Sequence, residues 1–174
     1  MFFAQMSGFP GSGKSTLAKE IAKRTGAIIV DHDISKSALL HSVGDGNIDP
    51  KLAGKISYNI DWSFIDFQLS LGNSVIFDSP CLYEEMVHKG TAFSNKYNAK
   101  YKYIECYVND FHTINRRLRN RKRLISQIEE VKSEIIFKNT IENCAKPSGY
   151  DCLKVNTSKP IEDYIFEVIK YINT

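Results

Sequence analysis

Short apolar runs and longer stretches with apolar residues at helical spacing alternate along the whole chain. Five runs are typical of strands: Phe2 to Met6, Ala27 to Val30, Ser74 to Phe77, Lys102 to Val108 and Asp151 to Val155. The segments between them are long enough for crossover helices, which favours a parallel sheet covered by helices on both faces. The chain is therefore predicted to have an α/β fold with a five-stranded parallel sheet.

The helical segments are bounded by recognisable start and stop residues. Asp49-Pro50 is a good helix start, Gly26 and Gly72 are good stops, and apolar residues recur three or four positions apart between them. The predicted helices are Lys14 to Arg24, 50 to 71 with Leu52, Ile56, Ile60, Phe64 and Leu69 at helical spacing, Tyr83 to Tyr97, one from Asp110 into an arginine-rich segment, Gln127 to Cys144, and one with Ile161, Tyr164, Ile165, Val168, Ile169 and Ile172 on one stripe.

Length and composition narrow the classes of protein. The 174 residues contain no repeat and no Pro/Gly/Ser-rich linker, so we expect one domain over residues 1–174. No apolar run approaches the ~18 residues of a membrane span, and no membrane partner is expected. Four cysteines stand singly at wide spacings, which favours reduced thiols in a cytoplasmic protein over a zinc site or a disulfide framework.

The positive charge is concentrated in one segment. Arg116 to Arg123 holds six of the 23 basic residues and no acidic one, and without them 17 basic residues face 20 acidic residues, a net charge of −3. A general affinity for nucleic acid is therefore not favoured. Like charges so crowded repel one another unless an anion binds between them, so the segment itself is a candidate anion site.

The clearest chemistry lies after the first strand. Residues 8–15, GFPGSGKS, match G-x-x-x-x-G-K-[ST] between an apolar strand and an amphipathic helix. In such a phosphate loop (P-loop, or Walker A motif), backbone N–H groups and the helix dipole bind phosphates, Lys14 reaches the β and γ phosphates, and the Ser15 hydroxyl is placed to hold Mg²⁺. The predicted nucleotide-binding residues of this segment are Gly8, Pro10, Gly11, Ser12, Gly13, Lys14, Ser15 and Thr16.

This loop, together with Asp31-His32-Asp33 and residues 75–80, VIFDSP, resembles the P-loop kinases of the nucleoside-monophosphate, shikimate and polynucleotide kinase group. It is most similar to small ATP-dependent kinases, AAA-type ATP-binding proteins related to phage polynucleotide kinase. The resemblance implies a three-layer P-loop NTPase fold, ATP with Mg²⁺, a helical lid and transfer of the γ-phosphoryl group to a hydroxyl acceptor.

Two acids follow the second strand, at the strand end where ligands bind in parallel sheets. If the segment is extended, Asp31 and Asp33 point the same way and both face the cleft, where they divide metal binding and proton abstraction between them. By resemblance, Asp31 lies on the metal side and Asp33 is the base at the acceptor. His32 between them is expected to be a surface residue that points away.

Asp78 closes the third strand, like the acid of a Walker B sequence, and is a candidate for metal binding or acceptor binding. Cys81 on the same rim has no recognisable activating residues, so it is not expected to be a nucleophile.

The arginine segment is the candidate lid, at about residues 116–130. At 100° per residue, Arg117 and Arg121 share one helical face and Arg119 and Arg123 another. Mobile arginines can neutralise the charge that phosphoryl transfer gathers. By resemblance, Arg117 lies near the adenine or the phosphate tail, Arg121 and Arg123 act from the lid, and Thr157 belongs to a loop over the adenine.

Three functions remain open. A kinase that uses ATP-Mg²⁺ and a small-molecule or nucleotide-type acceptor is favoured, because the Asp-x-Asp site suits a hydroxyl. The alternatives are a nucleotide-dependent ATPase or switch without an acceptor, and a kinase of 5′-hydroxyl polynucleotide ends. The acceptor pocket is expected between residues 34 and 48 and on the rim after Asp78; the acceptor and the oligomeric state are not predicted.

Overall fold

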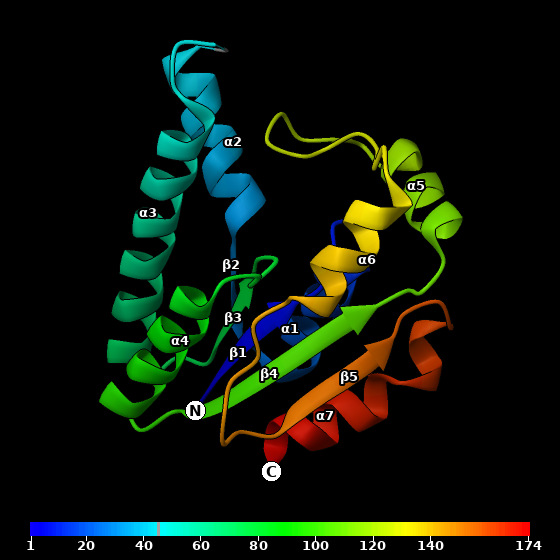
Figure 1. The fold of residues 1–174 in the computed structure, drawn as a ribbon. Helices are drawn as coiled ribbons and strands as arrows, with labels where there is room; N and C mark the ends of the chain where they lie inside the picture. Colours follow the sequence, from blue (N-terminus) through cyan, green and yellow to red (C-terminus); the bar gives the residue numbers. More distant parts are fainter. Residues whose placement is uncertain (45) are drawn as a thin grey trace.

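The computed structural model describes residues 1–44 and 46–174 and contains five parallel strands in one sheet (Figure 1). The strands are β1 (Phe2–Ser7), β2 (Ile28–Asp31), β3 (Val75–Asp78), β4 (Lys100–Tyr107) and β5 (Cys152–Asn156). Their order across the sheet is β2-β3-β1-β4-β5, and every neighbouring pair is parallel. The predicted α/β fold class is confirmed, and each strand was placed to within about two residues of its ends.

Helices cover both faces of the sheet (Figure 1). They are α1 (Lys14–Thr25), α2 (His32–Val43), α3 (Pro50–Ser70), α4 (Glu84–Lys96), α5 (Phe111–Asn120), α6 (Glu134–Glu142) and α7 (Ile165–Asn173), with a 3₁₀ turn at Ile161–Asp163 before α7. Apolar residues of α1 and α7 pack on one face, and those of α3 and α4 pack on the other. A third cluster joins the phosphate loop to α5 and α6 through Phe9 and Phe137, whose ring centroids are 4.9 Å apart.

Two helices differ from the prediction. The helix expected over Gln127 to Cys144 is only Glu134–Glu142, because Ser133 caps it: the hydroxyl accepts from the Ile136 N–H at 3.3 Å. The helix α5 ends at Asn120, so residues 121–133 form a loop. Consecutive like charges disfavour a helix here, and the loop instead bonds to its own carbonyls and to α2.

The helix α2 was missed. Its buried residues are His32 and Ser37, so it lacks the apolar stripe from which helices are predicted. It begins instead with an N-cap, since Asp31 accepts hydrogen bonds from the N–H groups of Asp33 and Ile34. The expected acceptor segment 34–48 therefore consists largely of this helix; residue 45 lies outside the described residues.

The stripe that predicted α3 mostly faces outward. Leu52, Ile60 and Phe64 are exposed, and only Leu69 of the predicted set is fully buried. The buried face of α3 consists of Ala53, Ser57, Asp61, Trp62, Ile65 and Leu69. The periodicity identified the helix but not the side that packs, because polar residues occupy part of the buried face.

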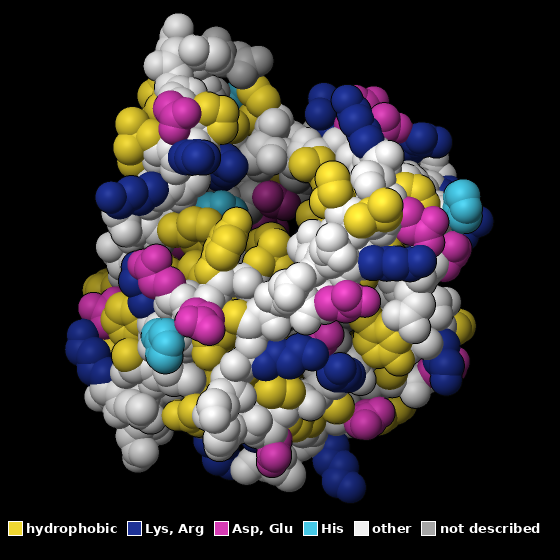
Figure 2. Space-filling model, viewed as in Figure 1, with side chains coloured by type: hydrophobic (Ala, Val, Ile, Leu, Met, Phe, Trp, Pro, Cys, Tyr) yellow, Lys and Arg dark blue, Asp and Glu magenta, His cyan; other side chains and the backbone are white. Residues whose placement is uncertain are grey.

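The carboxyl ends of β1, β2 and β3 meet at one edge of the sheet. Asp31 and Asp78 are register partners there, and the phosphate loop follows β1 beside them. Between the α2–α3 wall and the α5–α6 wall the surface is hollowed, with histidine and acidic side chains visible inside (Figure 2). Within the described ranges, no helix has the length and apolar character that a membrane span requires.

Candidate active site at the carboxyl edge of the sheet

The phosphate loop is shaped by its contacts with neighbouring strands. Gly8 has φ +130°, and a Cβ at this position would collide with the carbonyl oxygen of Cys106 on β4. Only glycine combines this backbone conformation with such a close approach. The loop then turns so that the Ser12 N–H donates to the Phe9 carbonyl at 3.0 Å.

The start of α1 is open to an anion. Gly13 precedes the helix without a side-chain cap, and the first turn contains no acidic residue. The N–H groups of Gly11 and Gly13 have no partner among the described residues. Because the first N–H groups of a helix have no partner within it and carry the positive end of its dipole, this end suits phosphate oxygens.

Lys14 lies at the centre of the loop and is only 8% exposed. Its Nζ donates to the carbonyls of Gly8 at 2.8 Å and Phe9 at 3.1 Å, and it belongs to none of the ion pairs among the described residues. Burial lowers the pKa of Lys14, and the nearby Asp78 and Asp33 oppose that shift. The positive charge of Lys14 therefore favours binding of an anion beside it.

Distant segments hold the loop from the β5 side. The Thr157 hydroxyl donates to the Ser12 carbonyl at 2.6 Å, and Arg117 donates to the Thr157 carbonyl at 2.7 Å and to the Gly11 carbonyl at 3.4 Å. Both residues expected near the nucleotide thus contact the phosphate loop. Thr16, in contrast, is exposed on α1.

Three carboxyl groups lie near one another, and two of them, Asp33 and Asp78, are near Lys14. Burial raises the pKa of Asp31 to about 6, and the neighbouring charges of Asp78 and Asp33 add to the shift. Burial also raises the pKa of Asp78, opposed mainly by Lys14 and the Ser15 hydroxyl. Acids held so close together favour a cation or a proton.

The prediction that Asp31 and Asp33 face the same way along an extended segment was wrong, although the two residues lie near each other. Only Asp31 is in a strand; Asp33 is in the first turn of α2. The Asp31 Oδ1 atom caps that helix, accepting from the Asp33 N–H at 2.9 Å. The two carboxyl groups approach each other because a strand ends in a helix cap, not because an extended segment alternates.

The donors at this edge fit Mg²⁺. Asp78 Oδ2 is buried without a hydrogen-bond partner, and the Ser15 hydroxyl lies against the same carboxyl. No group of three or more His, Cys, Asp or Glu side chains within residues 1–44 and 46–174 could hold a metal ion alone. Magnesium bound with a nucleotide needs only one or two protein ligands, since water and phosphate oxygens supply the others.

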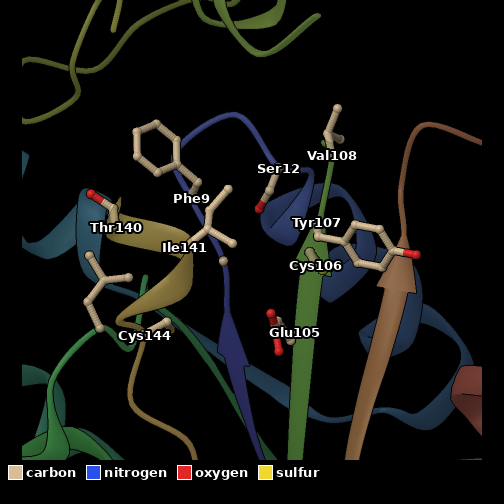
Figure 3. Close-up of a pocket in the computed structure, with 11 residues that line it drawn as sticks. Phe9, Ser12, Glu105, Cys106, Tyr107, Val108, Thr140, Ile141 and Cys144 are labelled. Carbon is tan, nitrogen blue, oxygen red and sulfur yellow. The ribbon is translucent and has the colours of Figure 1, made fainter. Parts of the chain in front are cut away.

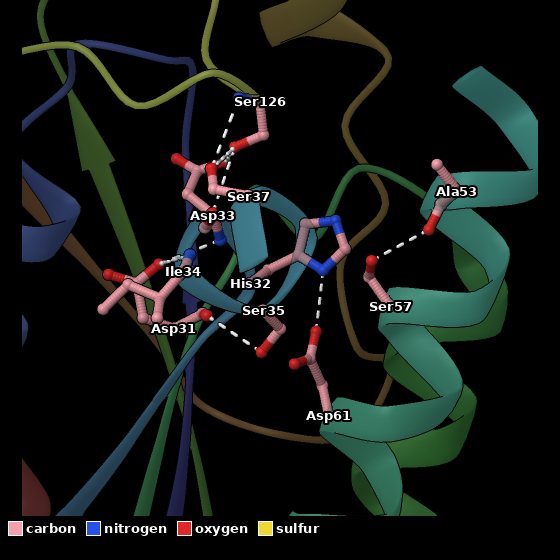
Figure 4. A network of polar contacts seen from close by, with 10 residues as sticks. All are labelled: Asp31, His32, Asp33, Ile34, Ser35, Ser37, Ala53, Ser57, Asp61 and Ser126. Carbon is pink, nitrogen blue, oxygen red and sulfur yellow. Dashed lines mark hydrogen bonds and ion pairs between the residues drawn. The ribbon is translucent and has the colours of Figure 1, made fainter. Parts of the chain in front are cut away.

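The 121–133 loop contacts α2 through Asp33 (Figure 4). Gln127 Nε2 donates to Asp33 Oδ2 at 2.7 Å, and the Ser126 hydroxyl donates to the Asp33 carbonyl at 3.1 Å. Ser37 on α2 donates to the Ser126 hydroxyl at 2.8 Å. We call these contacts the lid latch: they join two segments almost 90 residues apart and cover the expected base.

The lid arginines do not lie as the helical pattern predicted. Since α5 ends at Asn120, Arg121 and Arg123 are in the loop, where they donate to the carbonyls of Ile128 at 2.8 Å and Gln127 at 3.4 Å. Burial lowers the pKa of Arg121, the Asp33 charge opposes this, and its Nε is a buried donor without a partner. Arg119 instead points to Glu130 and is mostly exposed.

His32 and Asp61 form a buried pair that was not predicted. His32, expected at the surface, is 6% exposed, and its Nδ1 lies 2.7 Å from Oδ2 of the fully buried Asp61 on α3. No local signal marks this pair, because its members are 29 residues apart. Cys81 is buried, and burial raises the pKa of its thiol, so it is a poor nucleophile.

A small pocket lies on the other side of the phosphate loop (Figure 3). It is lined by Phe9 and Ser12, by the end of β4 and by α6. Glu105 in its wall pairs with Lys146 at 3.0 Å, and Ser7 meets Cys144 at 3.3 Å. Gly8 and Ser12 of the phosphate loop line it, but none of the expected catalytic residues does, so the hollow on the α2 side is the candidate active site (Figure 2).

The hollow brings together Lys14, Asp33, Asp78 and Arg121, each of which affects the pKa of another. The charge of Arg123 affects the pKa of Arg121, whereas Arg119 pairs with Glu130. The arrangement offers cations for a phosphate chain, carboxyl groups for a metal ion, and one carboxylate under the lid.

Comparison with known proteins gives matches to a family and to solved structures. A family model described as AAA domain matches residues 4–139, which is most of the chain. No curated protein matches the sequence.

Three solved structures show the fold. A sugar kinase from Janibacter sp. HTCC2649 has a TM-score of 0.69 at 15% identity, covering 99% of this chain and 95% of its own. Shikimate kinase from Aquifex aeolicus has a TM-score of 0.66 at 15% identity, with coverages of 99% and 96%. APS kinase from Mycobacterium tuberculosis, in complex with AMPPNP and APS, has a TM-score of 0.64 at 13% identity, with coverages of 99% and 98%. At these identities the likeness establishes a P-loop kinase-like fold.

Proposed function

Since this chain belongs to the family described as AAA domain and has the fold of P-loop kinases, we propose that it transfers the γ-phosphoryl group of ATP to a hydroxyl of an acceptor molecule. The observation that carries this proposal is the convergence of Lys14, Asp33 and Arg121 in one hollow. A nucleotide-binding module needs the lysine alone. A base and a lid cation around the same point are what phosphoryl transfer to a hydroxyl needs.

In the proposed site, the phosphate chain of ATP lies along the open N–H groups of the phosphate loop, and Lys14 contacts its β and γ phosphates. Arg117 and Thr157 support the loop from the nucleotide side, as their bonds to Gly11 and Ser12 suggest. AMPPNP bound to the similar APS kinase supports ATP as the nucleotide.

Ser15, Asp78 and Asp31 would hold Mg²⁺. When bound, the ion neutralises phosphate charge and fixes the geometry of the phosphates. The unpartnered Asp78 Oδ2 and the raised pKa of Asp31 are the features that favour a cation at this position.

Asp33 is the proposed base. It takes the proton of the acceptor hydroxyl as the acceptor oxygen bonds to the γ-phosphorus; the bond from that phosphorus to the bridging oxygen breaks and ADP leaves with the electron pair. Arg121 and Arg123 stabilise the charge that gathers on the transferring group. Because Gln127 holds the Asp33 carboxylate, acceptor entry requires the lid, residues 116–130, to open.

The direct test is an acceptor screen. Wild-type protein with ATP and Mg²⁺ is incubated with adenosine, D-glucose, D-gluconate, shikimate, kanamycin and a 5′-hydroxyl oligonucleotide, and both ADP and the phosphorylated product are measured. Transfer to one of them supports the kinase. ADP release that is the same without any acceptor favours the ATPase or switch, and transfer to the oligonucleotide alone favours the polynucleotide kinase.

A further inference from the structure

The buried His32–Asp61 pair has a geometry that a packing role does not require. His32 is the first residue of α2, and its Nδ1 is 2.7 Å from Asp61 Oδ2 (Figure 4). Its ring stacks on that of Tyr58, at 3.7 Å between centroids and 8° between planes. Two contacts from α3 therefore fix both the position and the rotation of the imidazole.

The second nitrogen of the His32 ring, Nε2, is available to bind another molecule. His32 Nε2 forms no hydrogen bond within the described part of the chain, and it is not among the buried polar atoms that lack a partner. His32 is only 6% exposed, yet Nε2 is not closed off, so this atom lies at the surface of the packed wall. Figure 4 shows it on the side of the ring opposite Asp61.

Polar atoms near the ring also lack partners. Oδ1 of the fully buried Asp61 and the hydroxyl of Ser79, which is 2% exposed, make no hydrogen bond in the described structure. The Tyr58 hydroxyl lies close to that serine side chain. Polar groups of Asp61 and Ser79 therefore lie in the wall behind the ring, beside the aromatic contact with Tyr58.

The position of His32 relates it to the proposed base. His32 and Asp33 are consecutive residues in the first turn of α2, where side chains project about 100° apart. Asp33 faces the lid and His32 faces α3 (Figure 4). A molecule lying across the start of α2 would meet both side chains, with different groups of its own.

We propose that His32 Nε2 binds a second hydroxyl of the acceptor, beside the hydroxyl that Asp33 deprotonates, so that the acceptor is a polyhydroxylated molecule. Asp61 and Tyr58 are positioning residues that hold the ring. A hydroxyl suits this nitrogen because it both donates and accepts, and therefore pairs with the imidazole in either protonation state. The inference rests on the proposed phosphotransferase activity.

The test compares two histidines of the same helix. His32→Gln removes the ring nitrogen that binds the acceptor, whereas His41→Gln changes an exposed histidine later in α2. For whichever compound of the screen is phosphorylated, we expect His32→Gln to raise the acceptor KM about tenfold or more, as for the loss of one hydrogen bond to a charged or well-placed group. The KM for ATP and the thermal shift caused by ATP-Mg²⁺ stay at wild-type values, and His41→Gln changes nothing.

A deoxy series separates recognition from support of the fold. If the acceptor is adenosine or D-glucose, the wild type is compared on it and on its single-deoxy analogues. One analogue should lose affinity with wild type but not lose it further with His32→Gln. Equal KM values for all analogues, or an unchanged acceptor KM in His32→Gln, overturn the inference while leaving the kinase intact.

If His32→Gln does not fold, the wild-type protein decides. The ¹⁵N signals of its histidine rings are followed by NMR during titration with the phosphorylated compound, in the presence of AMPPNP. A shift of the His32 Nε2 signal supports binding there, and an unchanged signal contradicts it. If wild type phosphorylates none of the compounds, the proposed function itself is wrong.

Discussion

The two sides of the hollow are built in different ways. On the nucleotide side, eight consecutive residues supply the phosphate loop, and the groups offered to phosphate are mainly backbone N–H groups and Lys14. On the acceptor side, His32 depends on Asp61, which is 29 residues away, and Ser37 and Ser126 are 89 residues apart. The proposed nucleotide site is thus encoded mainly by one local motif, which Thr157 and Arg117 then support from distant segments. The proposed acceptor site exists only once α2, α3 and the 121–133 loop have packed.

This difference affects what each side tolerates. The phosphate loop is constrained by close approach: a side chain at Gly8 would collide with β4. The acceptor wall is constrained by polar pairs whose members come from separate helices. Substitutions on the nucleotide side should therefore abolish binding, and those on the acceptor side should change selectivity or rate while nucleotide binding persists.

The largest effect is expected for Lys14→Ala. The ammonium is buried and has no acidic partner within ion-pair distance among the described residues, so its loss removes the cation available to the phosphates. We expect ATP-Mg²⁺ to give no thermal stabilisation of this variant. Lys23→Ala, on the exposed end of the same helix, is the matched control and should respond like wild type. A normal shift for Lys14→Ala would contradict the proposed nucleotide site.

Asp33→Asn should separate the two sides. The amide oxygen can still accept the bond from Gln127, but the group can no longer take a proton. We expect ATP-Mg²⁺ binding to be preserved and transfer to fall ~10²-fold or more, the usual size of general-base catalysis. Asp49→Asn changes a carboxylate outside the proposed site, the one that caps α3, and should leave the rate unchanged. Wild-type rates for Asp33→Asn would remove it from this role.

The same contrast explains which features could be predicted. The sheet and the phosphate loop follow from local signals: apolar runs, and glycines at fixed spacing before a lysine. The helix α2 could not be predicted from periodicity, because its buried residues, His32 and Ser37, are polar and form no apolar stripe. The stripe Leu52, Ile60 and Phe64 predicted α3 correctly but pointed to the wrong face.

Individual site residues show the same limit. Asp33 was selected because it follows a strand near the phosphate loop, and it lies within electrostatic reach of Lys14. His32, its neighbour, was predicted to be at the surface but is buried, since nothing near it in the sequence identifies Asp61 or Tyr58 as partners. The prediction that Arg121 lies on the same helical face as Arg117 was wrong, because the end of a helix depends on contacts that its own sequence does not contain.

A smaller effect is expected at the lid latch, where the two sides meet. Gln127→Ala removes the 2.7 Å bond that Gln127 Nε2 donates to Asp33 and the 3.2 Å bond that Gln127 Oε1 accepts from the Leu124 N–H. We expect amide hydrogens of residues 121–131 to exchange about tenfold faster, which corresponds to a net loss of about 1.4 kcal/mol for the two hydrogen bonds together. Gln127→Glu, which places a carboxylate against Asp33, should speed exchange further.

Lys132→Ala, at an exposed position near the end of the same loop, is the control for that measurement. Slowing of exchange in wild type when AMPPNP and acceptor are both present would agree with a lid that closes over them. Equal exchange in all variants would mean that the latch does not hold the loop.

The smallest effect is a pH dependence at the boundary between the two sides. Burial and the charges of Asp78 and Asp33 raise the pKa of Asp31 to about 6, so its protonated form is favoured in the folded protein. This contribution to the free energy of unfolding is full below the ordinary carboxyl pKa of about 4 and is lost as the pH rises through about 6. Thermal melting of the nucleotide-free protein at about pH 4.5, 6 and 8 measures it.

Asp31→Asn keeps a side chain that caps α2 but cannot ionise, so it should lose less stability than wild type over this range. Parallel pH profiles for the two proteins would show that ionisation of the Asp31 carboxyl does not cause the loss of stability. They would also weaken the case for a cation site between Asp31 and Asp78.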